Sequence, residues 1–229
     1  MVIGNGMIAA AFGSYKGKED FLIFASGVSD STHSGDAAFK REKELLSTTI
    51  QNNPGKTLVY FSTCSIYDTS LKDSLYIRHK LEMESLIMQQ QPAYIIFRLS
   101  NPVGKTGNTK TVVNFFINHI LEKQSFGLWK KAGRNILDMD DVYRICDSIL
   151  QERQFQNSIV NIANPVNYPV SFIVENIEKH LGVKAVYTVI DKGDSPHIDV
   201  SGIEPLFTKF NINFDENYLS RLLQKYFPR

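Results

Sequence analysis

The chain begins Met1-Val-Ile-Gly-Asn-Gly-Met-Ile-Ala-Ala-Ala-Phe-Gly13. A short apolar run is followed by Gly4 and Gly6 and then by residues that favour a helix. The spacing Gly4-x-Gly6-x-x-Ala9 is typical of the turn between the first strand and the first helix of a dinucleotide-binding α/β fold. There the glycines permit a tight turn and let a pyrophosphate approach the free N–H groups of the helix start. A plain glycine turn between a strand and a helix has the same pattern, so this motif alone leaves both interpretations open.

Beyond this turn, apolar runs of strand length alternate with longer stretches of helical period. The runs MVIG, DFLIFAS, KTLVYFS and AYIIFRLS are short and nearly continuous, as expected for parallel strands buried on both faces. Between them, residues 6–14, 36–52 and 74–90 carry apolar residues at helical spacing. The alternation predicts an α/β fold with a doubly wound, mostly parallel, Rossmann-like sheet.

After Gly104 the pattern is looser. The sequence predicts helices over 111–123, 140–152 and 171–182, a strand or loop over 125–139, and a strand over 158–164. Neither a repeat nor a linker interrupts the chain. We therefore expect a single domain over residues 1–229, in which residues about 105–135 and 165–229 contribute a small C-terminal substrate lobe.

The composition of the chain disfavours some classes of binding partner. The chain has 229 residues, 43% of them hydrophobic, so it can bury a sizeable core. With 25 Lys and Arg against 24 Asp and Glu, and no block of either sign, the charge pattern favours neither nucleic acid nor an anionic membrane. No apolar run reaches the roughly 20 residues of a membrane span. Cys64 and Cys146 are interpreted as free thiols of a reducing compartment, so we expect a cytoplasmic protein.

Side chains that could take part in catalysis or ligand binding lie where the predicted strands end. The stretch SLYIRHKLEME places Tyr76 and Lys80 one helical turn apart on the same face. Such a pair occurs by chance in many helices, but the preceding strand ends in Ser62, Thr63 and Ser65, and open α/β sheets bind ligands at the carboxyl ends of their strands. The earlier stretch FASGVSDS offers small residues at an equivalent place, which leave room for a cofactor or form a plain loop.

Several segments, in order, resemble the motifs of the extended short-chain dehydrogenase/reductase superfamily, which includes the NAD-dependent epimerases and dehydratases of nucleotide sugars. The segments are GNGMIA, FLIFASG, YFSTCSIYD, YIRHK, FRLSNPVG and NILDMDDV. The resemblance implies NAD or NADP as cofactor, a nucleotide-sugar substrate, and 4-ketone reduction or epimerisation in surface polysaccharide or deoxysugar biosynthesis. It also allows a homodimer formed through helices 36–52 and 74–90.

The resemblance assigns roles to individual residues. Thr63 would polarise the substrate oxygen, with Ser62 and Ser65 as alternatives, and Tyr76 would give or take the proton. Free tyrosine has a pKa near ~10, so Lys80 would be needed to favour the phenolate. The implied cofactor residues are Gly4, Gly6, Met7, Ile8, Ala25, Ser26, Gly27, Ser62, Tyr76, Lys80 and Pro102, and the implied substrate residues are Thr63, Ser65, Asn101 and Arg134. No set of residues has metal-ligand spacing.

The sequence also departs from that pattern. Only about ten residues, Ala11 to Asp20, separate the glycine turn from FLIFASG, so two strands that would hold the adenosine half of the cofactor are expected to be missing. This motivates an alternative hypothesis of a catalytically inactive, Rossmann-like nucleotide-binding or sensor protein. Cys64 and Ser65 replace the acidic pair of the dehydratases, and Cys64 is more simply explained as a small buried residue. His79 is expected to point away from Tyr76 and Lys80.

Overall fold

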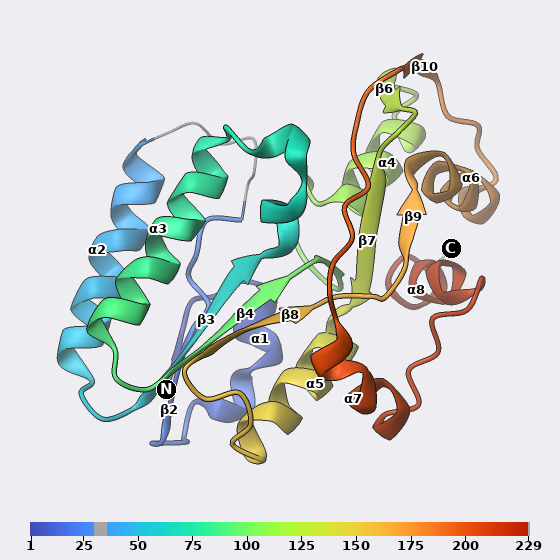
Figure 1. Cartoon of the computed structure of the whole chain (residues 1–229). Coiled ribbons are helices and arrows are strands. Elements are labelled where there is room, and N and C mark those ends of the chain that lie inside the picture. Colours follow the sequence, from blue (N-terminus) through green and yellow to red (C-terminus); the bar gives the residue numbers. More distant parts are fainter. Residues whose placement is uncertain (30–35, 229) are drawn as a thin grey trace.

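A five-stranded, wholly parallel sheet forms the centre of the structure (Figure 1). Its strands are arranged in the order β1 (Val2–Ile3), β2 (Phe21–Phe24), β3 (Thr57–Thr63), β4 (Tyr94–Leu99) and β8 (Ser158–Ile162). The computed structural model describes residues 1–29 and 36–228, so Asp30 and Ser31 of the FASGVSDS stretch lie outside the described residues. The sheet confirms the predicted Rossmann-like α/β fold.

Helices cover both faces of this sheet, which explains why its strands are nearly continuous apolar runs. On β3, Leu58 and Tyr60 pack with one buried cluster, which also contains Leu46 and Met83, whereas the alternate residues of β3 pack with the larger core. The first face is covered by α2 (Asp36–Asn52) and α3 (Leu75–Gln90), and the other by α1 (Met7–Ala11) and α5 (Met139–Gln151).

The sheet is reduced on the side of its first strand. Within the described residues β1 pairs with β2 alone and lies at the edge of the sheet. After α1, a 3₁₀ turn (Gly13–Tyr15) leads almost directly into β2, where a longer chain could add further strands. The prediction of a sheet with fewer strands is therefore confirmed.

A second group of elements packs beside the carboxyl ends of the sheet strands (Figure 1). Here β5 (Asn101–Val103) runs parallel to β7 (Gly133–Asp138), and β7 runs antiparallel to β9 (Asn167–Pro169). The segment predicted as one strand or loop over 125–139 forms two strands, β6 (Phe126–Trp129) and β7, and β6 pairs with β10 (Tyr187–Ile190). The helices of this group are α4 (Val112–Leu121), α6 (Val170–Leu181), α7 (Glu204–Lys209) and α8 (Tyr218–Tyr226).

Over residues 1–29 and 36–228, no helix combines the length and the apolar character needed to cross a bilayer.

Candidate active site

A cleft of about 330 Å³ opens at the carboxyl ends of the sheet strands. It brings together the glycine turn, the loop after β2, the end of β3, the start of α3 and residues 99–114. The predicted site residues that line it are Gly6, Met7, Ile8, Ala25, Gly27, Ser62, Thr63, Ser65, Tyr76, Lys80, Asn101 and Pro102. The predicted residues Gly4, Ser26 and Arg134 do not line it.

Gly4 lies against the backbone of Ala25, which lines the cleft. Its φ of +123° lies in the region that favours glycine, and a Cβ there would come within 2.3 Å of the Ala25 carbonyl oxygen. The first turn can therefore pack against the loop after β2 only with glycine at position 4. Gly6 differs, because a Cβ built on it meets nothing within 4 Å.

This contrast gives a matched pair of variants. We expect Gly4→Ala to lower the free energy of unfolding by about 1–3 kcal/mol, because it adds both a strained φ and a backbone clash. Gly6→Ala should unfold like the wild type in urea. Equal unfolding free energies for Gly4→Ala and the wild type would contradict the close approach of residues 4 and 25.

Thr63 and Tyr76 meet at the bottom of the cleft, and both are buried. The Thr63 side chain lies close enough to Tyr76 to lower the pKa of the phenol, and its Oγ1 accepts from the Ser65 N–H at 3.0 Å. The neighbouring Ser62 hydroxyl donates to Glu84 Oε1 at 2.5 Å. Of these two hydroxyls, that of Thr63 is therefore the one that acts on the phenol.

Lys80 lies in a buried polar cluster with Glu42 of α2, Tyr60 of β3 and His79 of α3. Its Nζ donates to Glu42 Oε1 and to the Tyr60 hydroxyl, both at 3.1 Å, and lies 5.9 Å from the centre of the Tyr76 ring. Glu42 Oε2 lies 2.9 Å from His79 Nε2. The expectation that His79 points away from Lys80 is therefore wrong, because both side chains converge on one carboxylate.

The surroundings of the Tyr76 phenol raise its pKa. Burial raises it to about 12, the Thr63 side chain opposes this rise, and the Glu42 charge adds to it. Burial lowers the pKa of Lys80, and Glu42 opposes that change. Burial is thus the main cause of the raised pKa of Tyr76, while the Lys80 ammonium near it is paired with the Glu42 carboxylate.

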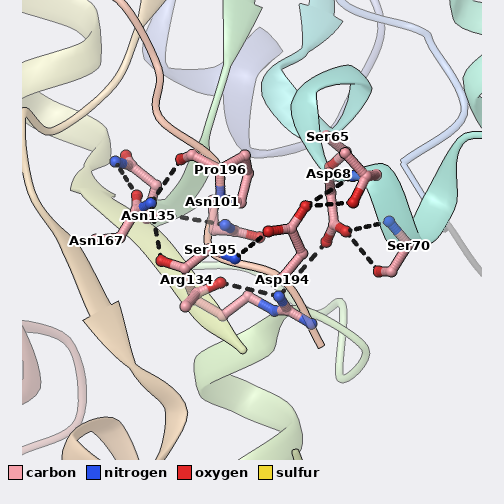
Figure 2. A network of polar contacts seen from close by, with 12 residues as sticks. Ser65, Asp68, Ser70, Asn101, Arg134, Asn135, Asn167, Asp194, Ser195 and Pro196 are labelled. Carbon is pink, nitrogen blue, oxygen red and sulfur yellow. Dashed lines mark hydrogen bonds and ion pairs between the residues drawn. The ribbon is translucent and has the colours of Figure 1, made fainter. Parts of the chain in front are cut away.

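Arg134 and Asn101 lie in a neighbouring polar network, which Figure 2 shows at close range. Arg134 Nη1 lies 3.7 Å from Asp68 Oδ2 and donates to the Gly133 carbonyl oxygen at 2.9 Å. Asn101 lines the cleft while its Nδ2 donates to the Asn135 carbonyl oxygen at 2.7 Å. The structure thus brings Asn101 to the cleft, whereas it places Arg134 outside the cleft lining and beside a carboxylate.

Two further residues have structural partners. The Cys64 thiol is buried and donates to the Arg98 carbonyl oxygen, and burial raises its pKa to about 12. Ser26 accepts from Arg41 through both its hydroxyl and its carbonyl oxygen. The interpretation of Cys64 as a small buried residue therefore agrees with its surroundings.

A family model described as NAD dependent epimerase/dehydratase family matches residues 26–163, more than half of the chain. The chain belongs to this family. The assignment confirms the resemblance and the prediction of an enzyme of the short-chain dehydrogenase/reductase type.

Solved structures show the same fold at low identity. The UDP-N-acetylglucosamine 4-epimerase of Methanobrevibacter ruminantium M1 is 18% identical, with a TM-score of 0.67 over 93% of this chain and 76% of that one. The UDP-glucuronic acid 4-epimerase of Bacillus cereus is 17% identical, with a TM-score of 0.70 over 90% and 76%. The dTDP-glucose 4,6-dehydratase of Bacillus anthracis is 16% identical, with a TM-score of 0.69 over 95% and 76%. No curated protein matches the chain by sequence.

Two residues at the family site were missed by the sequence analysis. Glu42 had a detectable signal, since it shares a helix face with Leu46 and Ile50 at spacings of four, which marks it as a buried position. Ser100 had none. Ser100 lines the cleft, and its hydroxyl is, among the described residues, a buried side-chain oxygen without a hydrogen-bond partner.

Proposed function

We propose that this chain is an NAD(P)-dependent nucleotide-sugar 4-ketoreductase or epimerase that uses Thr63, Tyr76 and Lys80. The observation that carries the proposal is the convergence of these three side chains in one cleft with the glycine turn. In the proposed reaction Tyr76 transfers the proton at the sugar oxygen, and Thr63 hydrogen-bonds that oxygen. Similar folds are described in complex with UDP-glucose and NAD and with UDP-glucuronic acid and NAD, which supports this substrate class.

The cleft fits the nicotinamide half of such a cofactor, which when bound supplies or accepts hydride. Gly6, Ala25 and Gly27 line the cleft with small or no side chains, and one of the three Lys80 N–H donors has no assigned partner in the described part of the chain. The unpartnered Ser100 hydroxyl is a further point of attachment. We propose Gly6, Met7, Ile8, Ala25, Gly27, Lys80 and Pro102 as cofactor contacts.

We further propose that residues about 105–135 and 165–229 form the part of the molecule that holds the substrate. Thr106, Asn108 and the residues from Lys110 to Asn114 line the cleft, which supports the assignment of the first of these two ranges. By analogy with the family, the reaction would belong to surface polysaccharide or deoxysugar biosynthesis in the cytoplasm.

The edge position of β1 gives a second candidate function, a non-catalytic nucleotide-binding or sensor protein. In the part of the chain that the structure describes, no strand lies beyond β1 where adenosine would be held, and the Nζ of Lys18 lies 4.1 Å from the centre of the Tyr15 ring. A sensor would have no use for the Thr63, Tyr76 and Lys80 set, so the enzyme is the better-supported function.

Cofactor binding discriminates between the two candidates. We expect micromolar binding of NADH or NADPH, followed by nicotinamide fluorescence and by thermal shift, since a ligand that binds only the folded state raises the melting temperature. Because the sheet ends at β1 on the adenosine side, the adenosine half should contribute little to binding. The dissociation constant of reduced nicotinamide mononucleotide should therefore exceed that of the dinucleotide by less than about tenfold, a difference in binding free energy below 1.4 kcal/mol. Binding should then be followed by a screen of UDP- and dTDP-linked hexoses and 4-keto-hexoses.

The opposite result is equally informative. If the folded protein binds neither dinucleotide, the missing strands have removed the cofactor site and the non-catalytic function is favoured. If NADH binds but the mononucleotide does not, the chain holds adenosine by contacts that this site does not include.

A further inference from the structure

Glu42 is held as a fixed negative charge beneath the cleft. Its carboxylate accepts from four donors: Tyr60 at 2.6 Å and Lys80 at 3.1 Å on Oε1, and the Val28 N–H at 2.6 Å and His79 at 2.9 Å on Oε2. Since a carboxylate has about four acceptor positions, all of them are filled. Burial alone would raise the pKa of Glu42, but the bonds from His79 and Tyr60 and the Lys80 charge together lower it to about 2.

Within residues 1–29 and 36–228, the charged and titratable groups around Tyr76 come from a few elements. Helix α2 contributes Glu42, β3 contributes the buried Tyr60 phenol, and α3 contributes His79, Lys80 and Glu84. Glu84 is paired with Arg98 of β4 by two hydrogen bonds. The loop after β2 reaches the cluster through Gly27 and Val28, which carry no charge. Lys110, from the segment before α4, lines the same cleft. On the helix side of Tyr76, the described charge nearest its ring is Lys80, whose Nζ lies 5.9 Å from the ring centre and is paired with Glu42.

Such a pair acts differently from a lone ammonium group. A lone Lys80 at roughly 6–8 Å would favour the Tyr76 phenolate by about one to two pH units at an effective dielectric constant near 20. A carboxylate 3.1 Å from Nζ cancels most of that field at Tyr76. The position of Lys80 is also fixed, because Tyr60 and Glu42 hold its Nζ and Gly27 leaves no space for a Cβ beside it.

We propose that Glu42 is a positioning residue that neutralises Lys80 and keeps Tyr76 a protonated phenol, so that this site is built to reduce a carbonyl rather than to oxidise an alcohol. The proposal rests on the proposed function and selects the 4-ketoreductase over the epimerase. An epimerase must first remove a proton from a hydroxyl, for which it needs the phenolate, whereas a reductase needs the phenol.

The chemistry balances with a reduced nicotinamide as the hydride donor. As hydride reaches the carbonyl carbon, the C–O double bond becomes a single bond and the Tyr76 proton moves to the oxygen. The ketone is reduced to an alcohol, the dihydronicotinamide is oxidised, and the Tyr76 phenolate regains its proton from water. A proton passes readily from a phenol with a pKa of about 12 to an alkoxide, because the alkoxide is the stronger base.

The proposal can be tested without substrate or cofactor, by titrating Tyr76 itself. Protein labelled with ¹³C at tyrosine Cζ is followed by NMR from pH 7 to 11, with circular dichroism as a check of folding at each pH. The Tyr76 signal is identified by its absence in Tyr76→Phe. We expect wild-type Tyr76 to remain a phenol beyond pH 10, and a midpoint below pH 9 would overturn the proposal even if no variant folds.

The variant Glu42→Gln tests whether Glu42 causes the high titration midpoint of Tyr76, and Glu44→Gln is its matched control. Glu44 lies on the same helix, exposed and paired with Lys40 at 3.8 Å. We expect Glu42→Gln to lower the Tyr76 midpoint by about one to two pH units and Glu44→Gln to leave it unchanged. The same midpoint in both variants would overturn the role of Glu42.

The preferred direction of the reaction, reduction or oxidation, is tested once a sugar nucleotide is found to react. With wild-type protein, alcohol oxidation should keep rising with pH beyond 10, and in Glu42→Gln this rise should begin one to two pH units lower. Wild-type oxidation with a midpoint near neutral pH would overturn the proposal. If the titrations behave as expected and no sugar nucleotide reacts, the proposed substrate class fails while the role of Glu42 stands.

Discussion

Replacing Tyr76 with phenylalanine should lower turnover by about 10²–10⁴-fold, the usual contribution of a positioned acid or base. The phenol lies at the floor of the cleft beside Thr63, and its hydroxyl is the group that the proposed reaction uses for proton transfer. Phenylalanine keeps the ring and its packing, so substrate binding should change far less than turnover. The measurement is the ratio of kcat to KM in the variant and the wild type, with the melting temperature of each.

A control is available on the same chain. Tyr187 of β10 is exposed and lies outside the cleft lining, so Tyr187→Phe should keep wild-type turnover. If Tyr76→Phe retained turnover while remaining folded, Tyr76 would not be the proton-transfer group. The proposed mechanism would then have to be abandoned.

The largest expected effect on stability concerns Glu84, which lies beneath the cleft on α3. Its carboxylate accepts from Arg98 Nε at 3.0 Å and Nη2 at 2.6 Å, and from the Ser62 hydroxyl at 2.5 Å. Burial would lower the pKa of Arg98, but Glu84 reverses this and raises it, so the guanidinium stays charged. Glu84→Ala should therefore lower the free energy of unfolding by about 3–5 kcal/mol, because it leaves that charge without its partner.

An exposed pair on the same helix provides the comparison. Glu82 lies 2.5 Å from Lys43 of α2, and both side chains are about half exposed. Glu82→Ala should lower the unfolding free energy by less than about 1 kcal/mol, since exposed pairs contribute little. The double variant Glu84→Met with Arg98→Met should recover much of the loss, because replacing both buried charges by apolar groups removes the unpaired ion. Equal urea midpoints for Glu84→Ala and Glu82→Ala would contradict the buried pair.

Several features of the fold followed from local pattern. The alternation of buried apolar runs with helical stretches predicted a doubly wound, mostly parallel sheet, and the short interval between Gly4 and Phe21 predicted a sheet with fewer strands. The cleft position of Thr63 and Tyr76 was also predictable, because parallel strands present their carboxyl ends at one edge. The subdivision of 125–139 into β6 and β7 was not predicted, since a short turn between two apolar runs leaves little trace in the pattern.

The charges of the site were predicted less well. The family motif assigns Lys80 the task of activating Tyr76, and nothing in that motif refers to the residue that faces Lys80 from another helix. Glu42 precedes Lys80 by 38 positions, and the two meet only because α2 and α3 pack side by side on one face of the sheet (Figure 1). Arg134 likewise meets Asp68 across a distance in the chain that no local spacing encodes (Figure 2).

The sequence by itself determined the α/β class, the parallel sheet, the loss of strands beyond β1, and the identity of the groups at the strand ends. These depend on periodicity and on short-range geometry, which the order of residues specifies directly. Only the tertiary structure decided which charges meet: Glu42 with Lys80 and His79, Glu84 with Arg98, and Asp68 with Arg134. Burial and Coulomb energy depend on distances between separate elements, and these distances exist only when the elements have packed.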